Sequence, residues 1–497
     1  MENESFDLLV AGGGINGAGI ARDAALRGLR VALCERADLG QGTSSHSSGL
    51  IHGGLRYLES YEVRLVHESL RERSVLSRTA AHLVRPLRFV LPHVPGLRPA
   101  WIMRAGLLLY DLLGGAAELP RSGSLRLRES PLADSMRESL DRAWTYSDCR
   151  TDDARLVVTT VAGAARAGAA IQVGAELVAA RRDDSGWNID LRDEGQGGVR
   201  SVRARALVNA AGPWVAGVRE RAQPGAHGHG VRLVLGSHIV VRRFWPGDNA
   251  FLLQNPDGRV VFVIPWPHAL ALVGTTDIAY EGDPAAAQAS NQEIAYLCEA
   301  VNRQMRVRLG PGDVLHRFAG VRCLVDDRSE NPSRVSRDYL LELEADRSGA
   351  PLLSVLGGKI TTYRHLAEKA VDRLEPWFPR MGRCRTGAEP LPGSECGPAG
   401  LASERERLLS GFRFVPTGHL ADLFDRHGTV ARALLEGCRN LGDLGRHFGA
   451  GLYEIEAEHA RRNEWAKRAG DVLWRRTKAG LGMSENERER FREWWSR

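Results

Sequence analysis

The sequence predicts an α/β fold in which a Rossmann-like dinucleotide-binding domain is interleaved with a mixed-sheet domain and followed by a helical C-terminal domain. Three observations support this prediction. A strand (6–11), a glycine-rich loop, a helix (15–27) and a second strand (30–35) follow one another at the start of the chain. Alternating apolar and polar stretches within 171–343 are typical of strands. Apolar residues recur at helical spacing in the C-terminal part, 384–497.

The glycine-rich loop has the residue types that a dinucleotide-binding turn requires. It contains G-x-G-x-x-G at Gly12, Gly14 and Gly17. The first glycine permits the tight turn, the second lets backbone approach a pyrophosphate, and the third lets the helix pack against the strand. The helix N-terminus then faces the phosphates with its unpaired N–H groups. Glu35, at the end of the second strand, can accept both hydroxyls of an adenosine ribose.

A second loop, residues 40–57, is rich in glycine and small hydroxyl residues. Such residues can wrap a polar, extended ligand closely and donate hydrogen bonds from backbone and side chains. The same composition is also typical of a flexible linker. The ending His52-Gly53-Gly54-Leu55-Arg56-Tyr57 adds aromatic and cationic groups, which argue against a linker. We therefore interpret this loop as part of a ligand site.

The next part of the chain predicts a helix followed by a meander of strands. A capping residue before an alanine-rich stretch predicts a helix at 151–167. Alternation between turn-forming residues predicts strands at 171–178, 187–191 and 199–208. The last strand ends in Asn209-Ala210-Ala211-Gly212-Pro213-Trp214. Small residues there bring the backbone against a flat or extended ligand, where larger side chains would collide.

Residues 231–343 predict a mixed sheet with helices, which we interpret as a substrate domain. His238 lies among β-branched residues, and a histidine in such a place is more often a hydrogen-bonded core residue than a base. Arg322 follows an apolar run, where an unpaired guanidinium would be costly. An internal carboxylate would satisfy this arginine, and a bound phosphate would satisfy it equally well.

A second glycine turn follows the strand predicted at 351–356. Its sequence is Gly357-Gly358-Lys359-Ile360-Thr361-Thr362, and a helix through Leu374 comes next. A strand, two glycines and a helix start with lysine and threonine predict a turn that binds an anion or a carbonyl. Only two glycines precede the lysine, and the four-residue spacer of a Walker A motif is missing. We therefore exclude an ATPase.

Composition sets the frame for these motifs. The 497 residues should form two or three domains, and 43% hydrophobic and 26% charged residues are ordinary for a soluble globular protein. The seven cysteines form no C-x-x-C pair, so we expect reduced thiols in a cytoplasmic setting and no metal site. The acidic start, 1–5, leads directly into a strand, so we expect no signal or transit peptide.

The net charge of +6 is compatible with nucleic acid, an anionic membrane, an anionic substrate or none of these as a partner. No RNA-binding signature accompanies the charge. No stretch reaches the ~20 apolar residues that span a bilayer. The best candidate, 101–113, is interrupted by Arg104 and Asp111. It could form an amphipathic helix on a membrane, but we favour burial inside the protein.

The C-terminal part, 384–497, begins after proline- and glycine-rich connections at 390–398. Its arginine-rich stretch, 459–478, contains Trp465 and Trp474. We interpret this part as a small helical cap with a cationic outer face. A face that docks on a membrane or a partner is the alternative.

The loop 40–57 closely resembles that of the FAD-dependent glycerol-3-phosphate dehydrogenases, which belong to the D-amino-acid-oxidase- and glycine-oxidase-like flavoproteins. The resemblance covers almost the whole chain, through the motifs at 52–57, 146–149, 152–156, 236–241, 274–277, 357–363 and 473–478. Two departures stand out. Gly49 occupies a position where relatives usually have lysine, and Cys323 one where they usually have proline.

The resemblance implies FAD rather than NAD as the cofactor. It implies an FAD-binding domain of 1–80, 150–230 and 344–383, a substrate domain of 81–149 and 231–343, and a C-terminal domain of 384–497. The residues that it implies for FAD are Gly12, Gly13, Gly14, Asn16, Gly17, Glu35, Thr43, Ser44, Ser45, Ser48, His52, Gly53, Gly54, Val178, Ala211, Gly212, Trp214, Gly358, Lys359, Ile360, Thr361 and Thr362.

The implied reaction is oxidation of sn-glycerol 3-phosphate to dihydroxyacetone phosphate by hydride transfer to FAD, with electrons passed on to membrane quinone. The implied substrate-binding residues are Arg56, Tyr57, Arg322, Arg337 and Lys359. The implied catalytic residues are His238, Arg322 and Lys359. We expect His238 to accept the C2 hydroxyl proton, with His52 or an activated water as alternatives. Lys359 would stabilise the reduced flavin or the developing carbonyl.

These implications also extend to partners. We expect a cytoplasmic protein held at the inner face of the cell membrane by contact with anionic lipid, with a homodimer left open and no nucleic acid. Three alternatives compete. A glycerol-3-phosphate oxidase would pass electrons to oxygen, and an amine or amino-acid oxidase would need only one carboxylate-binding arginine. A non-enzymatic protein that binds nucleic acid or membrane would explain the charge but not the flavin motifs.

Overall fold

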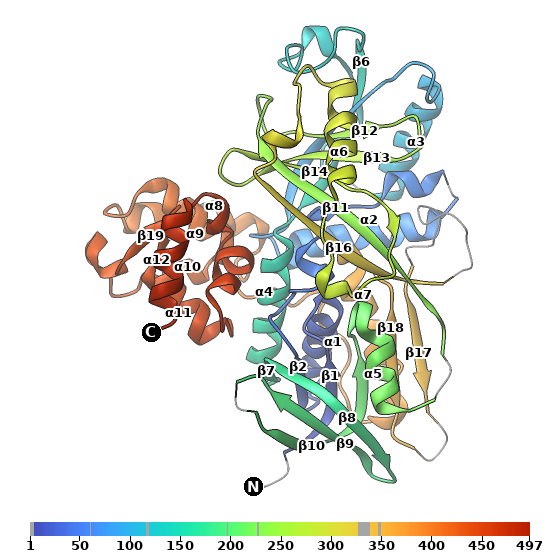
Figure 1. Cartoon of the computed structure of the whole chain (residues 1–497), viewed down its shortest axis with the longest axis vertical. Coiled ribbons are helices and arrows are strands. Elements are labelled where there is room, and N and C mark those ends of the chain that lie inside the picture. The colour runs from blue at the N-terminus through green and yellow to red at the C-terminus, as the bar shows by residue number, and fades with distance from the viewer. Residues whose placement is uncertain are drawn as a thin grey trace.

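The computed structural model describes residues 4–59, 61–115, 119–195, 197–225, 228–326, 338–345 and 349–497. Two large sheets follow one another along the long axis of the molecule, and a helical C-terminal domain lies against one side (Figure 1). The chain enters the first sheet, crosses to the second, returns, crosses again and returns once more before it reaches the C-terminal helices. The predicted interleaved α/β fold is therefore confirmed.

The first sheet is a parallel sheet with an antiparallel edge. Its order is β17-β18-β10-β1-β2-β7, and a hairpin of β8 and β9 extends from β10. β18, β10, β1, β2 and β7 run parallel, whereas β17 pairs antiparallel with β18. The strands are β1 (Ser5–Ala11), β2 (Val31–Glu35), β7 (Ala170–Val173), β8 (Ala175–Asp183), β9 (Gly186–Asp193), β10 (Val199–Asn209), β17 (Leu340–Glu344) and β18 (Leu352–Leu356).

Both faces of this sheet are covered, which explains why its central strands are almost wholly apolar. Leu8 and Val10 of β1 pack with α1, α4 and α7 on one face. Leu9, between them, packs with the β8–β9 hairpin and α5 on the other face, because successive side chains of a strand alternate. The helices are α1 (Ile15–Leu26), α4 (Asp153–Arg166), α5 (Val215–Ala222) and α7 (Tyr363–Asp372).

The second sheet is mostly antiparallel. Its order is β15-β11-β14-β13-β12-β4-β6-β3, with β16 paired to β11 and β5 to β6. α6 packs on one face, and α2 and α3 pack on the other. The elements are β3 (Leu50–Ile51), α2 (Val63–Thr79), β4 (Arg85–Pro92), α3 (Ala100–Leu113), β5 (Gly123–Arg126), β6 (Arg142–Arg150), β11 (Val231–Arg242), β12 (Ala250–Gln254), β13 (Val260–Trp266), β14 (Leu270–Gly274), β15 (Ile278–Ala279), α6 (Asn291–Gln304) and β16 (His316–Val325).

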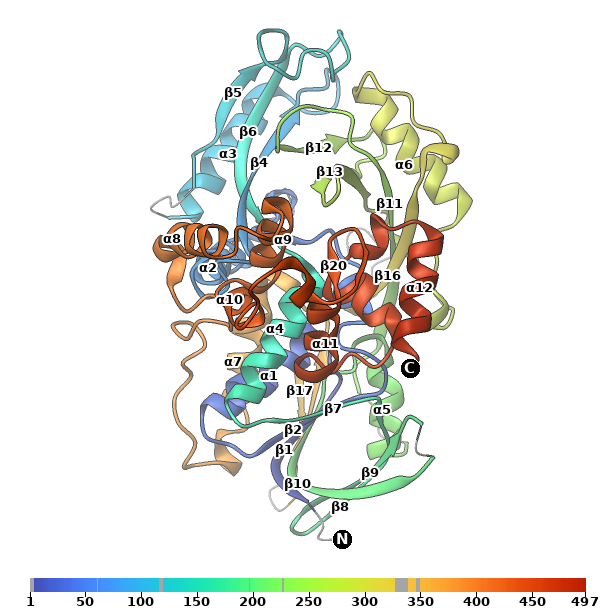
Figure 2. The same ribbon diagram turned by 90° about the vertical axis from the view of Figure 1, so that its left-hand side faces the viewer.

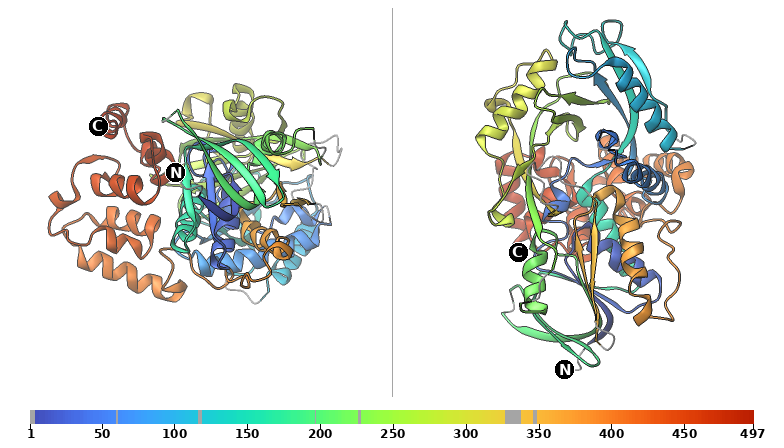
Figure 3. Two further views of the ribbon diagram at one scale, coloured as in Figure 1. Left: turned by 90° about the horizontal axis from the view of Figure 1, so that it is seen from below. Right: turned by 90° about the vertical axis from the view of Figure 1, so that its right-hand side faces the viewer.

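The C-terminal domain is helical, as predicted, and has two small cores of its own. It lies beside α4, in front of the first sheet in Figure 2 and to one side of the two-sheet body in Figure 3. Its elements are α8 (Gly397–Gly411), α9 (Thr417–His427), α10 (Val430–Leu434), β19 (His447–Gly449), β20 (Leu452–Tyr453), α11 (Glu454–Asn463), the π-helical turn η10 (Asp471–Arg476), η11 (Ala479–Leu481) and α12 (Glu485–Trp495).

The structure differs from the sequence-based expectations at several elements. The strand expected at 171–178 is interrupted at Gly174, whose φ of +70° turns the chain from β7 into β8. β3 pairs in the second sheet and β17 in the first, although the expected boundaries placed 50–51 and 340–343 in the opposite domains. Both strands lie where the chain crosses between the sheets, so local pattern alone does not assign them.

The prediction that 101–113 is buried is wrong. These residues form α3, which buries Met103, Leu107 and Tyr110. Trp101 and Leu112 are 72% and 78% exposed, and Ile102, Leu108 and Leu109 are also exposed. The helix therefore has apolar residues on its outer side as well as its inner side. Among the described residues, no helix is both long and apolar enough to cross a membrane.

Candidate active site

Residues from both sheets line one cavity of about 1230 Å³. This volume exceeds the ~300–1000 Å³ of ordinary small-molecule sites. One wall comes from the carboxyl ends of β1, β2 and β10, where ligands bind in open parallel sheets. The opposite wall comes from β12, β13 and β16 of the second sheet. The cavity therefore has room for a dinucleotide together with a second, smaller molecule.

Glycines allow the backbone to approach closely at the end of β1. Gly12 has a φ of +115°, and a Cβ there would lie 2.5 Å from the Ala210 carbonyl oxygen. A Cβ on Gly17 would lie 1.9 Å from the Gly12 carbonyl oxygen. Gly14 lines the cavity immediately before α1, so the N-terminus of this helix faces the ligand space. The three glycines therefore have the separate roles that their spacing predicts.

Glu35 lies at the end of β2 and lines the cavity. Its carboxylate accepts hydrogen bonds from the backbone N–H groups of Gly13 and Ala37, at 2.7 and 2.9 Å. Burial raises the pKa of Glu35, although these two N–H groups oppose the shift. Nearby, the Arg36 guanidinium lies 4.2 Å from the centre of the Trp214 ring, and both side chains line the same end of the cavity.

The hydroxyl-rich loop connects both walls of the cavity. The Ser44 hydroxyl accepts from the Ile15 N–H at 3.0 Å and so caps α1. The Thr43 hydroxyl donates to the Val321 carbonyl oxygen at 2.5 Å, on the second sheet. These bonds show that the loop is an ordered part of the site rather than a linker.

Several cationic side chains line the cavity. Arg56, Arg322 and Lys359 all line it. The Lys359 Nζ lies 3.7 Å from the centre of the Tyr57 ring, within the range of a cation–π contact. Arg322 forms an ion pair with Asp277 and also donates to the Thr275 hydroxyl at 3.2 Å. The sequence allows either an internal carboxylate or a bound phosphate as the partner of Arg322. The structure shows the carboxylate of Asp277, and Arg322 also lines the cavity in which a phosphate can bind.

Two histidines were considered as bases, and they occupy different positions. His52 is half-buried in the cavity wall. His238 is 1% exposed and lies outside the cavity wall as the described residues define it. Its Nε2 lies 2.9 Å from the Ser48 hydroxyl, and its ring stacks on Phe318. Burial first, and nearby cationic groups second, lower the pKa of both histidines to about 3.

The comparisons with known proteins agree with this geometry. The family model for FAD dependent oxidoreductases matches residues 7–364. The chain belongs to the FAD-dependent oxidoreductase family. A D-erythritol 1-phosphate dehydrogenase of Brucella abortus (strain 2308) is 48% identical over 494 residues, which cover 99% of this chain and 98% of that relative. A glycerol-3-phosphate dehydrogenase of Pseudomonas aeruginosa is 48% identical over 489 residues, 98% of this chain and 94% of that relative.

A solved structure extends the likeness to three dimensions. The glycerol-3-phosphate dehydrogenase from Bacillus halodurans complexed with FAD aligns with a TM-score of 0.77 and 26% identity, over 100% of this chain and 95% of that one. FAD is accordingly the cofactor, and the cavity fits it. The glycines of β1, the start of α1 and Glu35 suit the adenosine and pyrophosphate part, which needs close backbone approach. The turn at Gly357, Gly358 and Lys359 lines the same cavity.

Most of the residues expected to bind FAD line the cavity. These are Gly12, Gly14, Asn16, Glu35, Thr43, Ser44, Ser48, His52, Gly54, Ala211, Gly212, Trp214, Gly358, Lys359, Ile360 and Thr361. The expected residues that lie outside the described cavity wall are Gly13, Gly17, Ser45, Gly53, Val178 and Thr362. Among the expected substrate ligands, Arg56, Tyr57, Arg322 and Lys359 line the cavity, and Arg337 lies outside the described residues.

Sequence reasoning missed several cavity residues, including Arg36, Gln41, His46, Leu177 and Cys323. Arg36 follows Glu35, and Gln41 lies within the loop 40–57, so their neighbours in the sequence were the signal that could have identified them. Leu177 takes the place expected of Val178, at a point where the pairing of β8 with β9 shifts register between Leu177 and Ala179. All seven cysteines are described and have free thiols, so Cys323 faces the cavity as a thiol.

The two departures from relatives have different structural settings. Gly49 has a φ of +62°, and a Cβ there would lie 2.6 Å from the Thr151 carbonyl oxygen. Glycine therefore suits the backbone of this chain at a position where relatives usually carry lysine. Cys323 is buried on β16, and burial raises the pKa of its thiol to about 11. It stays protonated at neutral pH.

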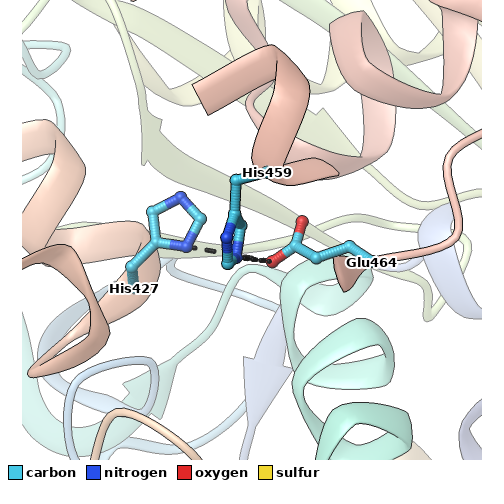
Figure 4. Close-up of side chains that lie close together, drawn as sticks. All are labelled: His427, His459 and Glu464. Carbon is cyan, nitrogen blue, oxygen red and sulfur yellow. Dashed lines mark ion pairs between the residues drawn. The ribbon is translucent and has the colours of Figure 1, made fainter. Parts of the chain in front are cut away.

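His427, His459 and Glu464 form a cluster outside the cavity (Figure 4). Their ligand atoms lie within 4.8 Å of one another, which makes them a candidate metal site. The Arg155 guanidinium, however, donates to both oxygens of Glu464 at 2.7 Å. The Nε2 of His427 lies 2.9 Å from Glu456. A protein cation already occupies the carboxylate, so this cluster is a buried ion-pair network between α4 and the C-terminal domain.

Proposed function

We propose that this protein oxidises sn-glycerol 3-phosphate to dihydroxyacetone phosphate. The observation that carries the proposal is the group of Arg56, Arg322 and Lys359 in the same cavity as the dinucleotide-binding glycines. A phosphate dianion requires several cations, and arginine matches phosphate with two parallel hydrogen bonds. The chain thus provides a place for the non-reacting phosphate beside the flavin end of the FAD site.

The residues divide the work of the reaction between binding and proton transfer. Bound FAD supplies the hydride acceptor. Arg56 and Arg322 hold the phosphate and orient the C2 carbon, so binding energy from the phosphate serves orientation. Asp277 and Thr275 fix the Arg322 guanidinium before substrate arrives. Lys359, fixed over the Tyr57 ring, places positive charge beside the reacting end of the cavity.

His52 is the better supported base of the two histidines. It lines the cavity, so a substrate bound there can reach its ring, whereas His238 is not among the described residues that line it. The lowered pKa leaves both rings neutral near neutral pH and does not distinguish them. His238 would have to act through the Ser48 hydroxyl. Replacing a general base lowers kcat by roughly 10²- to 10⁴-fold. His52→Gln should show this loss, and a comparable loss in His238→Gln alone would transfer the role to His238.

A four-carbon polyol phosphate is the second candidate substrate. It is favoured by the D-erythritol 1-phosphate dehydrogenase of Brucella abortus, whose identity to this chain equals that of the Pseudomonas enzyme. The test is ketone product formed with an artificial electron acceptor from glycerol 3-phosphate, D-erythritol 1-phosphate and glycerol. A higher kcat/KM on glycerol 3-phosphate supports the first proposal. A higher kcat/KM on the tetritol phosphate replaces it with the second.

We also propose that electrons pass to membrane quinone and that α3 is the membrane-facing element at the inner face of the cell membrane. α3 and the adjoining η2 (Leu55–Leu58) pack together, and η2 contributes Arg56 and Tyr57 to the cavity. Arg121 has an exposed side chain and precedes Ser122, whose N–H and hydroxyl donate to Asp111 of α3. An exposed apolar helix face beside a cationic residue suits anionic lipid.

Vesicles of anionic and of neutral lipid test the membrane proposal. A Trp101→Gln/Leu112→Gln variant should lose sedimentation with anionic vesicles, because it removes the two most exposed apolar side chains of α3. Val199→Ser and Leu441→Ser are matched controls, since both positions are exposed apolar residues elsewhere. Unchanged binding of the α3 variant with loss in Leu441→Ser would move the contact to the C-terminal domain. Turnover with quinone and no hydrogen peroxide would separate a dehydrogenase from an oxidase.

A further inference from the structure

Residues 474–478 of the C-terminal domain, here the clamp segment, contact the FAD site from outside. They consist of the last three residues of η10 and the two that follow. The last of them, Lys478, has a φ of +56°, which is rare for a residue with a side chain. π-Helical turns and left-handed non-glycine residues are uncommon, and both concentrate at functional sites. None of these five residues is among the described residues that line the cavity. Their role must therefore be exerted through other residues.

The first contact is to the start of the flavin loop, defined as residues 38–48. The Arg476 guanidinium donates to both carboxylate oxygens of Asp38 at 2.7 Å. Arg475 forms a second ion pair with the same carboxylate. Arg476 and Asp38 are 1% and 3% exposed. Two residues further on, the Gly40 N–H donates to the Gly13 carbonyl oxygen at 2.9 Å, within the dinucleotide-binding turn.

The second contact is to the end of the same loop. The Lys478 Nζ lies 2.5 Å from Asp152 and 3.6 Å from Asp153. Asp153 in turn accepts from the N–H and the hydroxyl of Ser47, at 3.1 and 2.8 Å. Ser47 lines the cavity. One buried cation of the C-terminal domain is therefore linked through a buried carboxylate to a residue that faces FAD.

The third contact is to the opposite wall of the cavity. The Trp474 ring stacks on His316, with ring centres 5.1 Å apart and planes within 6° of parallel. His316 begins β16, the strand that carries Arg322 and Cys323. The clamp segment thus joins the flavin loop to the second sheet, so both walls of the FAD site are held by the same short stretch of chain.

We propose that the clamp segment positions the flavin loop, and that docking of the C-terminal domain is thermodynamically coupled to FAD binding. Asp38 lies at the start of the loop and is paired with Arg475 and Arg476. Ser47 lies near its end and donates to Asp153, which lies beside Lys478. Coupling of this kind is reciprocal, so bound FAD strengthens docking as much as docking strengthens FAD binding. Arg476 and Lys478 are positioning residues. The proposal rests on the FAD site and is independent of the substrate.

The test is the Kd of FAD for the deflavinated full-length chain, measured by quenching of flavin fluorescence. Lys478→Met keeps the length of the side chain and removes its charge. We expect it to weaken FAD binding by about 5- to 150-fold, the usual range of coupling between sites. Lys478→Arg should restore most of the affinity. Arg468→Ala is the matched control, because Arg468 and Glu194 form an exposed ion pair between the same two parts of the molecule.

A change in FAD affinity must be separated from general destabilisation. The second measurement is hydrogen exchange of residues 384–497 in the apo and FAD-bound states, which coupling predicts to be slower when FAD is bound. A double-mutant cycle of Lys478→Met with Ser47→Ala should be non-additive in the FAD Kd, because the two act through Asp153. An unchanged FAD Kd in folded Lys478→Met, with equal exchange in both states, would overturn the proposal. Neither measurement uses substrate, so the substrate assignment is tested separately.

Discussion

The FAD cavity and the interface with the C-terminal domain are built on different physical principles. The cavity wall is made largely of glycines, small residues and backbone groups, and its cations face the ligand space. The interface is made of long charged side chains that are buried and paired with one another. Arg155 with Glu464 and Arg476 with Asp38 are examples, and all four side chains are almost inaccessible.

This difference shows how one chain combines a tight ligand site with a fixed arrangement of domains. Backbone that must touch a ligand tolerates no side chain, so the cavity depends on shape. Buried ion pairs add little net stability over apolar packing but are costly when one partner is lost. They therefore specify one arrangement of the domains, because another arrangement would leave buried charges without their partners. The two regions should respond differently to substitution, pH and loss of charge.

The largest effect is expected in the cavity wall. Gly17→Ala places a Cβ 1.9 Å from the Gly12 carbonyl oxygen, where no side chain can move aside. We expect loss of bound FAD and of most folded protein, measured by the flavin-to-protein ratio and by thermal unfolding. Gly217→Ala is the matched control in the same wall, because a Cβ there meets open space in a helix. Alanine should be tolerated there or stabilise by about 0.5–1 kcal/mol. Similar losses in both variants would mean that close backbone contact does not distinguish Gly17 from Gly217.

The next largest effect is expected at the interface. Glu464→Gln leaves the Arg155 guanidinium buried without its carboxylate, which costs about 3–5 kcal/mol in known cases. Urea unfolding should show this loss. Arg468→Ala, at the exposed pair with Glu194, should cost only about 0–1 kcal/mol. Equal costs would mean that burial does not distinguish these interdomain pairs.

Acid should destabilise the interface as well as the buried histidines at the cavity. Burial, and secondarily Arg155, lower the pKa of His427 to about 4. Between the ordinary histidine pKa and about pH 4, the unfolded chain therefore binds more protons at this residue than the folded chain does. The contribution of His427 to stability is present above the unfolded pKa and is lost as pH falls, by about 2 kcal/mol between about pH 7 and about pH 5. Urea unfolding at the two pH values checks this. A His427→Gln variant should lose about 2 kcal/mol less than the parent over this range, because His52 and His238, whose pKa values are also lowered, contribute losses of their own in both proteins.

The smallest effect is expected in the pH dependence of turnover, which depends on His52 in the cavity wall. If His52 is the base, burial and the nearby Lys359 lower its pKa to about 3 and keep it neutral near neutral pH. The kcat at saturating substrate should then show no fall near the ordinary histidine pKa of ~6.5. A fall near that pH that disappears in His52→Gln would contradict the lowered pKa.

The same two regions show what the sequence could and could not predict. The role of Gly12, Gly14 and Gly17 follows from spacing within one βαβ unit, so local pattern was sufficient. Arg476 and Asp38 are far apart in the chain, and an arginine-rich stretch reads as a solvated surface until its partners are known. The prediction of a cationic outer face at 459–478 therefore missed the half-buried Arg475 and the buried Arg476 and Lys478. The burial of α3 was predicted wrongly, because apolar residues alone do not indicate which side of a helix the rest of the protein covers.

His238 illustrates a further limit. The sequence places it in an apolar strand, which favours a core residue over a base but does not exclude a base. Only the fold shows that Ser48 and Phe318 lie against it while His52 reaches the cavity wall. Distances across two interleaved sheets depend on how the chain crosses between them, and that information is not local.

The proposed reaction requires that a polyol phosphate reduces the bound flavin directly. Anaerobic mixing of the yellow holoprotein with sn-glycerol 3-phosphate, followed through the visible absorbance of the flavin, tests it most directly. We predict rapid bleaching with one flavin reduced per ketone formed, and none with glycerol or amino acids. An Arg322→Met variant should need far more substrate for the same bleaching. Persistent yellow colour with both glycerol 3-phosphate and erythritol 1-phosphate, while an amino acid bleaches the flavin, would contradict the account.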